Sequence, residues 1–147
     1  MLYHTSPNKI EKITMDGTFY DCLFFSNEIY VMTQCDTYYV YEINEEDFNF
    51  ICASDLYNEE IISKIENYFE CDTKGAEELL TGYTSVFDLA IEDASEKDWW
   101  LQAIRGECAK KMGFDGCEDR DEQGTVYIIP MFGREKDIKF LKTCQNN

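Results

Sequence analysis

The sequence predicts an α+β fold in which strands near both ends of the chain flank a helical middle part. Runs rich in β-branched and aromatic residues occur before residue 45, and apolar residues recur at helical spacing between residues 56 and 112. Another apolar run follows at 125–131. Because strands and helices are segregated rather than alternating, a doubly wound sheet is not expected. The 147 residues contain no linker, repeat or low-complexity tract, so we expect one domain over residues 1–147.

Three short strands are expected in the first part of the chain. Residues 2–4 (LYH) predict a short strand that ends before Pro7. The apolar run CLFF at 22–25 predicts a second strand. The third is expected at 37–43 (TYYVYEI), because β-branched and aromatic side chains suit a half-buried pleated surface.

Two helices are expected in the middle of the chain. A stripe of apolar residues predicts the first over residues 56–69. A shorter helix is expected over 73–80, because Gly82 then breaks the pattern. The stripe of the first helix consists of Leu56, Ile61, Ile62, Ile65 and Phe69.

The clearest helix is expected after Ser95. Ser95 with Asp98 three residues later resembles a capping box, with Asp in place of the usual Glu. Two lysines fall in the last turn, where the helix dipole favours cations, and Gly113 then supplies the C-terminal cap. The apolar residues at four-residue spacing are Trp100, Ile104, Cys108 and Met112.

The last part of the chain predicts a turn at 113–116, an acidic loop at 119–124, and two strands. The first strand, TVYIIPM at 125–131, is ended or moved to a sheet edge by Pro130, and the second is DIKFL at 137–141. The acidic loop resembles the start of an EF-hand, but its twelfth position is Pro130 instead of a bidentate Glu. We therefore expect no metal there.

Composition limits the functional classes. The net charge of −17 argues against direct binding of nucleic acid, which needs clustered Lys and Arg, and is compatible with a basic protein partner or with a merely solvated acidic surface. The seven Cys residues form no CxxC pair, which favours free thiols in a reducing cytoplasm. Neither a secretion signal nor a membrane-spanning segment is visible.

Three features remain as candidates for chemistry. His4 is the single histidine, Tyr30 follows the end of an apolar strand by about one helical turn, and carboxylates precede the buried run at 125–131. Each has an ordinary structural explanation when taken alone: a strand-end histidine, a core tyrosine and a solvated turn. Glycine-rich phosphate loops of the GxGxxG or GKS/T type are missing from the sequence, and His4 could activate only one of the cysteines.

Taken together, these three features resemble the ordered His-Tyr-Glu arrangement of the ADP-ribosyltransferase superfamily. LYHTSP resembles its first motif, and LFFSNEIYVM resembles the segment in which a strand leads to a helix bearing Tyr. GFDGC and DEQGTVYII resemble its last turn and its Glu-led strand. The strings HTSP, EIYVMT, AEEL and DEQGT are most similar to the phage-encoded anti-CRISPR ADP-ribosyltransferases that act on the type I-F surveillance complex. This resemblance runs from Leu2 to about Lys139.

The resemblance implies two small antiparallel or mixed sheets around an NAD cleft with flanking helices. It assigns His4 to a ribose hydroxyl of NAD, the backbone of Thr5 to the nicotinamide amide, and the ring of Tyr30 to the nicotinamide ring. Ser26 is included among the cofactor-binding residues. Many family members have Gly after the His, and the side chain of Thr5 would narrow that pocket. NAD is consumed as a substrate, and no metal is required.

The same resemblance places the catalytic carboxylate just before the apolar strand. Glu122 is the preferred candidate to hold the ribose 2′-hydroxyl and stabilise the positive transition state, with Asp121 as the alternative. Gln123 is included with the cofactor-binding residues and would orient the acceptor. Lys9 and Lys12, close in sequence to His4, are expected to offset the negative pyrophosphate of NAD.

The implied function is NAD-dependent mono-ADP-ribosylation of a protein. The target would be a nucleic-acid-binding subunit of a CRISPR-Cas complex in the cytoplasm of a host bacterium, and the modification would block DNA binding. Two alternatives remain: a non-enzymatic acidic mimic of nucleic acid that occupies a basic groove, and an ADP-ribosylating toxin with another target. The net charge of −17 fits the mimic equally well.

Overall fold

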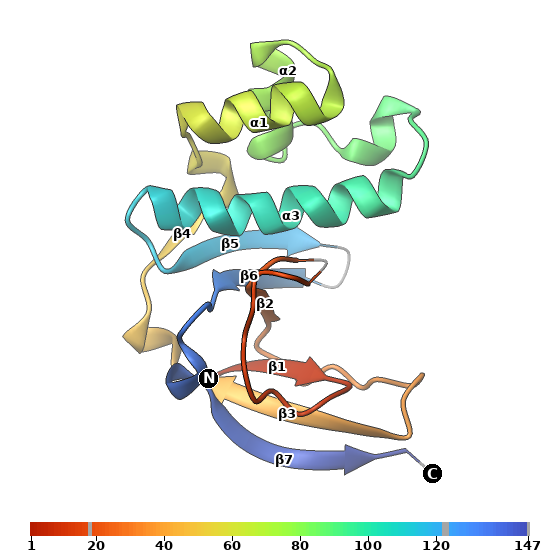
Figure 1. The fold of residues 1–147 in the computed structure, drawn as a ribbon, viewed down its shortest axis with the longest axis vertical. Coiled ribbons are helices and arrows are strands. Elements are labelled where there is room, and N and C mark those ends of the chain that lie inside the picture. The colour runs from red at the N-terminus through yellow and green to blue at the C-terminus, as the bar shows by residue number, and fades with distance from the viewer. Residues whose placement is uncertain (18, 122–123, 147) are drawn as a thin grey trace.

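The computed structural model describes residues 1–17, 19–121 and 124–146, and within these residues it shows two β-sheets and three α-helices (Figure 1). The predicted α+β class is confirmed. The helices are α1 (Glu59–Phe69), α2 (Thr73–Leu80) and α3 (Ala94–Lys111). The strands are β1 (Leu2–Ser6), β2 (Cys22–Phe25), β3 (Thr37–Ile43), β4 (Phe50–Cys52), β5 (Gly116–Asp121), β6 (Gly124–Pro130) and β7 (Lys139–Gln145).

The two sheets differ in their pairing. The first has the order β1-β3-β7 and is antiparallel. The second has the order β2-β6-β5-β4, in which β4 and β5 run parallel and the other pairs are antiparallel. Figure 1 shows α3 lying along the second sheet, with α1 and α2 beyond it, while the first sheet lies on the side away from the helices. The second sheet is therefore the middle layer.

Two hydrophobic clusters fill these layers. The larger one joins α1, α2 and α3 to the second sheet, with Ile65, Leu101 and Ile128 fully buried. The smaller one lies between the two sheets and includes Leu2 of β1 and Phe25 of β2. Apolar side chains on strands of both sheets meet there, so β1 and β2 are held next to each other without being neighbours in one sheet.

The helix predictions are largely confirmed, with one correction at a helix start. Asn58 caps α1 by accepting a hydrogen bond from the amide of Ile61 at 3.1 Å. The capping box predicted at Ser95 is wrong, because α3 begins at Ala94, after Asp93, with no side-chain cap. Asp98 instead accepts a hydrogen bond from Gln102 Nε2 at 2.7 Å, one turn further along α3.

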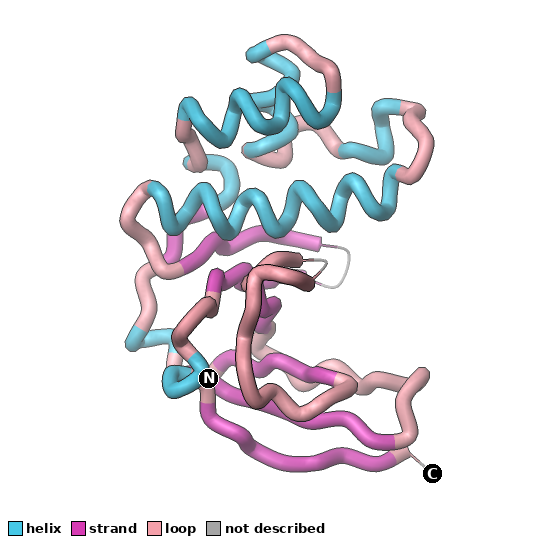
Figure 2. Tube along the Cα trace, viewed as in Figure 1, coloured by secondary structure: helices cyan, strands magenta, loops and turns pink. Residues whose placement is uncertain are grey.

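Three further segments differ from the sequence-based expectation. The acidic segment expected to be a loop contributes to strand β5, in which Asp119 pairs with Val126 of β6. Strand β4 was not predicted. The expectation that Tyr30 lies on a helix is wrong, because residues 27–36 form loop and turn (Figure 2). None of the helices among the described residues is long and apolar enough to span a membrane.

Candidate functional site

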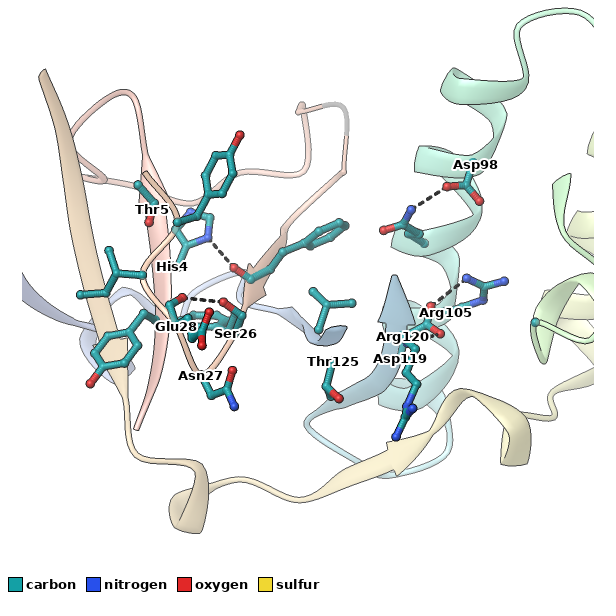
Figure 3. Close-up of a pocket in the computed structure, with 18 of the residues that line it drawn as sticks. His4, Thr5, Ser26, Asn27, Glu28, Asp98, Arg105, Asp119, Arg120 and Thr125 are labelled. Atoms are coloured by element: carbon teal, nitrogen blue, oxygen red, sulfur yellow. Dashed lines mark hydrogen bonds and ion pairs between the residues drawn. The ribbon is translucent and has the colours of Figure 1, made fainter. Parts of the chain in front are cut away.

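A cleft of about 1020 Å³ opens where the ends of β1 and β2 face α3 and β5. Its walls come from residues 3–5, residues 24–31, residues 84–87, and side chains of α3, β5 and β6. Figure 3 shows His4, Thr5, Ser26 and Glu28 on one side and Asp98, Arg105, Asp119 and Arg120 on the other. The cleft thus has one wall made by the first strands and one made by the helical layer and the β5–β6 pair.

A main-chain bridge builds the first wall. The amide of Tyr3 donates to the carbonyl of Ser26 at 2.7 Å, and the amide of Ser26 donates to the carbonyl of Tyr3 at 3.0 Å. This antiparallel bridge connects β1 of one sheet with the end of β2 of the other. His4 and Thr5 follow directly in β1, so the bridge sets their position beside Ser26.

His4 has a defined tautomer in this wall. Its Nδ1 lies 2.8 Å from the carbonyl oxygen of Phe24, which can only accept a hydrogen bond (Figure 3). Nδ1 therefore carries the proton and Nε2 is left as an acceptor. Burial lowers the pKa of His4 below its usual 6.5, although the hydrogen bond to Phe24 opposes this shift. The imidazole is neutral at pH 7 and can accept a hydrogen bond from a hydroxyl group.

The hydroxyl groups of Thr5 and Ser26 have different surroundings. The Oγ1 of Thr5 is buried and has no hydrogen-bond partner among the described residues. The hydroxyl of Ser26 donates to the carbonyl of Glu28 at 2.6 Å, which closes a local turn. The proton of Ser26 is therefore already used, and only its oxygen remains as an acceptor.

Tyr30 lies on the rim of the same wall and is 48% exposed. Its segment is loop and turn, and the end of this segment is bonded to the C-terminal part of the chain. Asn146 Nδ2 donates to the carbonyls of Met32 at 2.6 Å and Cys35 at 2.7 Å. These bonds satisfy backbone oxygens outside any helix, and they leave the ring of Tyr30 beside the cleft.

The opposite wall contains a buried ion pair that the sequence analysis missed. Arg105 of α3 donates from Nη1 to Asp119 Oδ2 at 2.8 Å (Figure 3). Its Nε and Nη2 donate to the carbonyls of Leu80 at 3.0 Å and Leu79 at 2.8 Å, at the end of α2. The sequence does contain a signal for this buried residue. Arg105 lies at helical spacing between Leu101 and Cys108, in a stripe that is otherwise apolar.

Asp119 is fixed on both carboxylate oxygens. Its Oδ2 accepts from Arg105, and its Oδ1 accepts from the amide of Arg120 at 2.8 Å. The side chain of Arg120 is exposed and lines the cleft, whereas Arg105 is buried in its contacts. Among the described residues, Arg120 is therefore the cation of this cleft that is accessible to a ligand.

The prediction that Lys9 and Lys12 offset the pyrophosphate charge of NAD is wrong. Neither Lys9 nor Lys12 is among the described residues that line the cleft. The ammonium of Lys9 lies 5.8 Å from the centre of the Tyr39 ring instead. The nearby turn after β1 carries them away from His4, so the positive charge of the cleft comes from β5 and α3.

The predicted catalytic segment is described only at its edges. Glu122 and Gln123 lie outside the described residues, and of Asp121 only the backbone is described, where it ends β5 and pairs with Gly124. Their roles stay predictions. The structure does bring His4, Thr5, Ser26 and Tyr30 to one cleft.

Comparisons with known proteins agree with this architecture. A solved structure described as "Crystal structure of an anti-CRISPR protein" is similar to this chain with a TM-score of 0.57 and 20% identity, covering 95% of this chain and 93% of the other. At that identity the likeness shows the fold. A search of curated proteins found no match. The model of the family described as "Anti-CRISPR Type I-F ADP-ribosyltransferase AcrIF11" matches residues 1–135. Because the match spans most of the chain, this protein belongs to the anti-CRISPR type I-F ADP-ribosyltransferase family.

Proposed function

We propose that this protein transfers ADP-ribose from NAD to a protein subunit of a CRISPR-Cas complex and thereby blocks the binding of DNA by that complex. The observation that carries the proposal is the cleft itself, which His4 lines from one wall and Asp119 and Arg120 line from the other. Its volume of about 1020 Å³ is at the upper end of the range for small-molecule and cofactor sites.

The residues of the cleft suit the parts of NAD. Neutral His4 accepts a hydrogen bond from a ribose hydroxyl through Nε2, since its Nδ1 is occupied by the carbonyl of Phe24. The exposed ring of Tyr30 provides a surface on which the nicotinamide stacks. The guanidinium of Arg120 pairs with the pyrophosphate, for which its planar fork is well matched. The backbone of Thr5, which lines the cleft beside His4, is the candidate contact for the nicotinamide amide.

The reaction breaks the bond between nicotinamide and the ribose. Nicotinamide leaves as a neutral molecule, and the ribose becomes positively charged and oxocarbenium-like. A nucleophilic atom of the target then bonds to the same carbon and loses its proton. A carboxylate near the ribose lowers the barrier because it is aimed at charge that develops only in the transition state. Glu122 is our first candidate and Asp121 the second.

Asp119 is a third carboxylate to test, because it lines the cleft and its orientation is fixed by Arg105. Its negative charge is partly compensated by that partner, which makes it a weaker stabiliser of a positive ribose than a carboxylate without a cation beside it. Substituting each carboxylate in turn separates these assignments.

Two alternatives predict a different dependence on NAD or on the target. A nucleic-acid mimic needs at least one molecule per target and ignores NAD. A toxin with another target shares the chemistry but leaves the CRISPR-Cas complex unmodified. Substoichiometric protein is incubated with a purified type I-F complex, with and without NAD, and DNA binding is assayed after a wash in high salt. We expect NAD-dependent loss of binding that persists, because salt releases steered contacts but not a covalent group.

Labelled NAD identifies the acceptor in the same reaction. One labelled subunit of the complex supports the proposal. Inhibition that is one-to-one, independent of NAD and reversed by the salt wash would instead establish the mimic.

A further inference from the structure

A second cluster of reactive side chains lies outside the cleft, where the start of β2 meets α3. Asp21 directly precedes β2, Cys22 is its first residue, and Glu107 comes from α3. One carboxylate oxygen each of Asp21 and Glu107 and the Sγ of Cys22 all lie within 4.8 Å of one another. Asp21 is 1% exposed and Cys22 is 5% exposed, while Glu107 is half-buried.

The carboxylates of this cluster are incompletely satisfied. Asp21 Oδ2 accepts a hydrogen bond from the amide of Phe132 at 3.0 Å. Asp21 Oδ1 and Glu107 Oε1 are both buried and have no hydrogen-bond partner among the described residues. Buried polar atoms almost always have a partner, and two negative groups placed together in the core repel each other strongly. The pair therefore requires a positive charge between its oxygens.

The surrounding side chains do not supply that charge. Lys110 and Lys64 act on Glu107 through their fields, but neither forms an ion pair with Glu107 among the described residues. Burial, followed by a side-chain hydrogen bond with Asp21 and the charge of Asp21, raises the pKa of Glu107 to about 7 in spite of these lysines. A metal ion or a shared proton remains as the source of the positive charge.

The thiol of Cys22 favours the metal ion, because two carboxylate oxygens and one thiolate form a donor set suited to zinc. Without an ion, the thiol donates to the carbonyl of Ala103 at 3.6 Å. The helix leaves room for this sulfur at Gly106, where an added Cβ would lie 2.9 Å from Cys22 Sγ. The three donors come from two elements, as is common for sites that join parts of a fold.

We propose that Asp21, Cys22 and Glu107 bind a divalent ion of the zinc class, which links the start of β2 to α3. Bond lengths of about 2.0 Å to oxygen and 2.3 Å to sulfur require donor separations of roughly 3.3–3.5 Å in a tetrahedron. The three donors lie within 4.8 Å of one another, and the proposal requires the half-buried Glu107 side chain to adjust so that all three reach the ion. Three protein donors leave the fourth position to water.

Binding has a chemical requirement at the sulfur. Burial raises the pKa of the Cys22 thiol, so the thiol is protonated in the metal-free protein and its proton leaves when the ion binds. We expect the ion to enter from the side of Glu107, because this residue is the least buried of the three. Because β2 also carries Phe24, whose carbonyl holds His4, the ion would stiffen the strand that orients the cleft.

The test uses the full chain without a histidine tag, stripped with a chelator and freed of it. Zinc is titrated while the bound metal per chain and the melting temperature are measured. We expect one ion per chain and a rise in melting temperature, because the ion binds the folded state. Cobalt in place of zinc should give the charge-transfer absorption of a thiolate ligand.

Variants assign the donors. Cys22→Ser should abolish the thiolate absorption, and Glu107→Gln should weaken zinc binding at least about tenfold, since even residues behind the ligands cost that much. The matched control is Cys52→Ser, which removes an exposed thiol that lies 3.8 Å from a Glu118 oxygen and should change neither signal. If Asp21→Asn fails to fold, the cobalt spectrum of the unchanged chain still decides.

Two results would overturn the proposal. One is a stripped chain that takes up no zinc and melts at the same temperature with and without it, which would mean that the carboxyl pair shares a proton. The other is thiolate absorption that survives Cys22→Ser but disappears in Cys52→Ser, which would place the metal at the surface.

Discussion

The guanidinium of Arg105 and the carboxylate of Asp119 form an ion pair of 2.8 Å between α3 and β5. The side chain of Arg105 is 8% exposed and that of Asp119 is 14% exposed, so the pair is largely removed from solvent. The other two nitrogens of this guanidinium, Nε and Nη2, donate hydrogen bonds to the last two carbonyls of α2. One side chain therefore connects two helices to the strand that lines the cleft.

Arg105→Met should destabilise the fold by about 3–5 kcal/mol, because it leaves the buried Asp119 and two helix-end carbonyls without a partner. Urea unfolding measures the loss. Arg105→Lys should recover part of it, since an ammonium restores the charge but not the fork geometry.

The control for that experiment is Arg120→Met, which removes an exposed cation of the same cleft. We expect its stability to change by at most about 0.5 kcal/mol while the affinity for NAD falls. Equal destabilisation by both substitutions would contradict the role given to Arg105.

His4 should make stability depend on pH in a defined window. Its pKa is lowered in the folded state by burial, so the unfolded chain binds the proton first as pH falls below 6.5. The stability contributed by neutral His4 is thus present above pH 6.5 and is lost as pH falls toward its lowered value. The limiting slope is about 1.4 kcal/mol per pH unit.

The measurement is a set of urea unfolding curves between pH 7.5 and pH 5, compared with those of His4→Asn, which cannot titrate. The difference between the two chains should shrink as pH falls. A constant difference across the range would show that His4 does not titrate differently in the folded state. At pH 7, His4→Ala should remove most of the rise in melting temperature that NAD produces.

The catalytic carboxylate is identified by isosteric substitutions. Glu122→Gln keeps the shape but removes the charge, and we expect the transfer rate to fall by roughly two orders of magnitude or more while NAD still binds. Asp121→Asn and Asp119→Asn are made in parallel. A larger loss from Asp121→Asn moves the assignment by one residue, and release of nicotinamide from NAD is the readout in each case.

Tyr30→Ala should weaken NAD binding by about tenfold or more, since stacking of a base on an aromatic ring contributes roughly 1–3 kcal/mol. Tyr30→Phe keeps the ring and should bind nearly as well as the original chain. Tyr83 is 83% exposed and is not among the described residues that line the cleft, so Tyr83→Ala is the matched control. Calorimetric titration with NAD compares the three variants.

The sequence predicts those elements in which the spacing of apolar residues along the chain is typical of a strand or a helix. It does not predict segments whose structure depends on contacts with residues far away in the sequence. The segment at 37–43 is strand by its composition alone, and it is β3. Strand β5 has the mostly polar sequence GCEDRD, which does not predict a strand, and two of its side chains line the cleft. It is a strand because it pairs with β6. The resemblance implies a helix at Tyr30, but the segment is a loop whose carbonyls at Met32 and Cys35 accept hydrogen bonds from Asn146, more than 100 residues away.

The candidate site shows the same division. The resemblance in sequence names residues of the first wall, and His4 and Tyr30 do reach the cleft. The opposite wall could not be predicted in this way, because the contact of Arg105 with Asp119 depends on how α3 crosses β5. The cation that lines the cleft also depends on the packing of the elements. Lys9 was expected there because it is close to His4 in sequence, but Arg120 of β5 lines the cleft instead.

The bridge between Tyr3 and Ser26 consists of main-chain N–H and C=O groups. The junction of the two sheets is consequently indifferent to the identity of either side chain, so distant relatives can diverge at both positions and still keep the same cleft. Proline is the exception, because it has no N–H to donate. This junction in the first wall is therefore formed by the backbone, whereas the opposite wall depends on side chains such as Arg105 and Asp119.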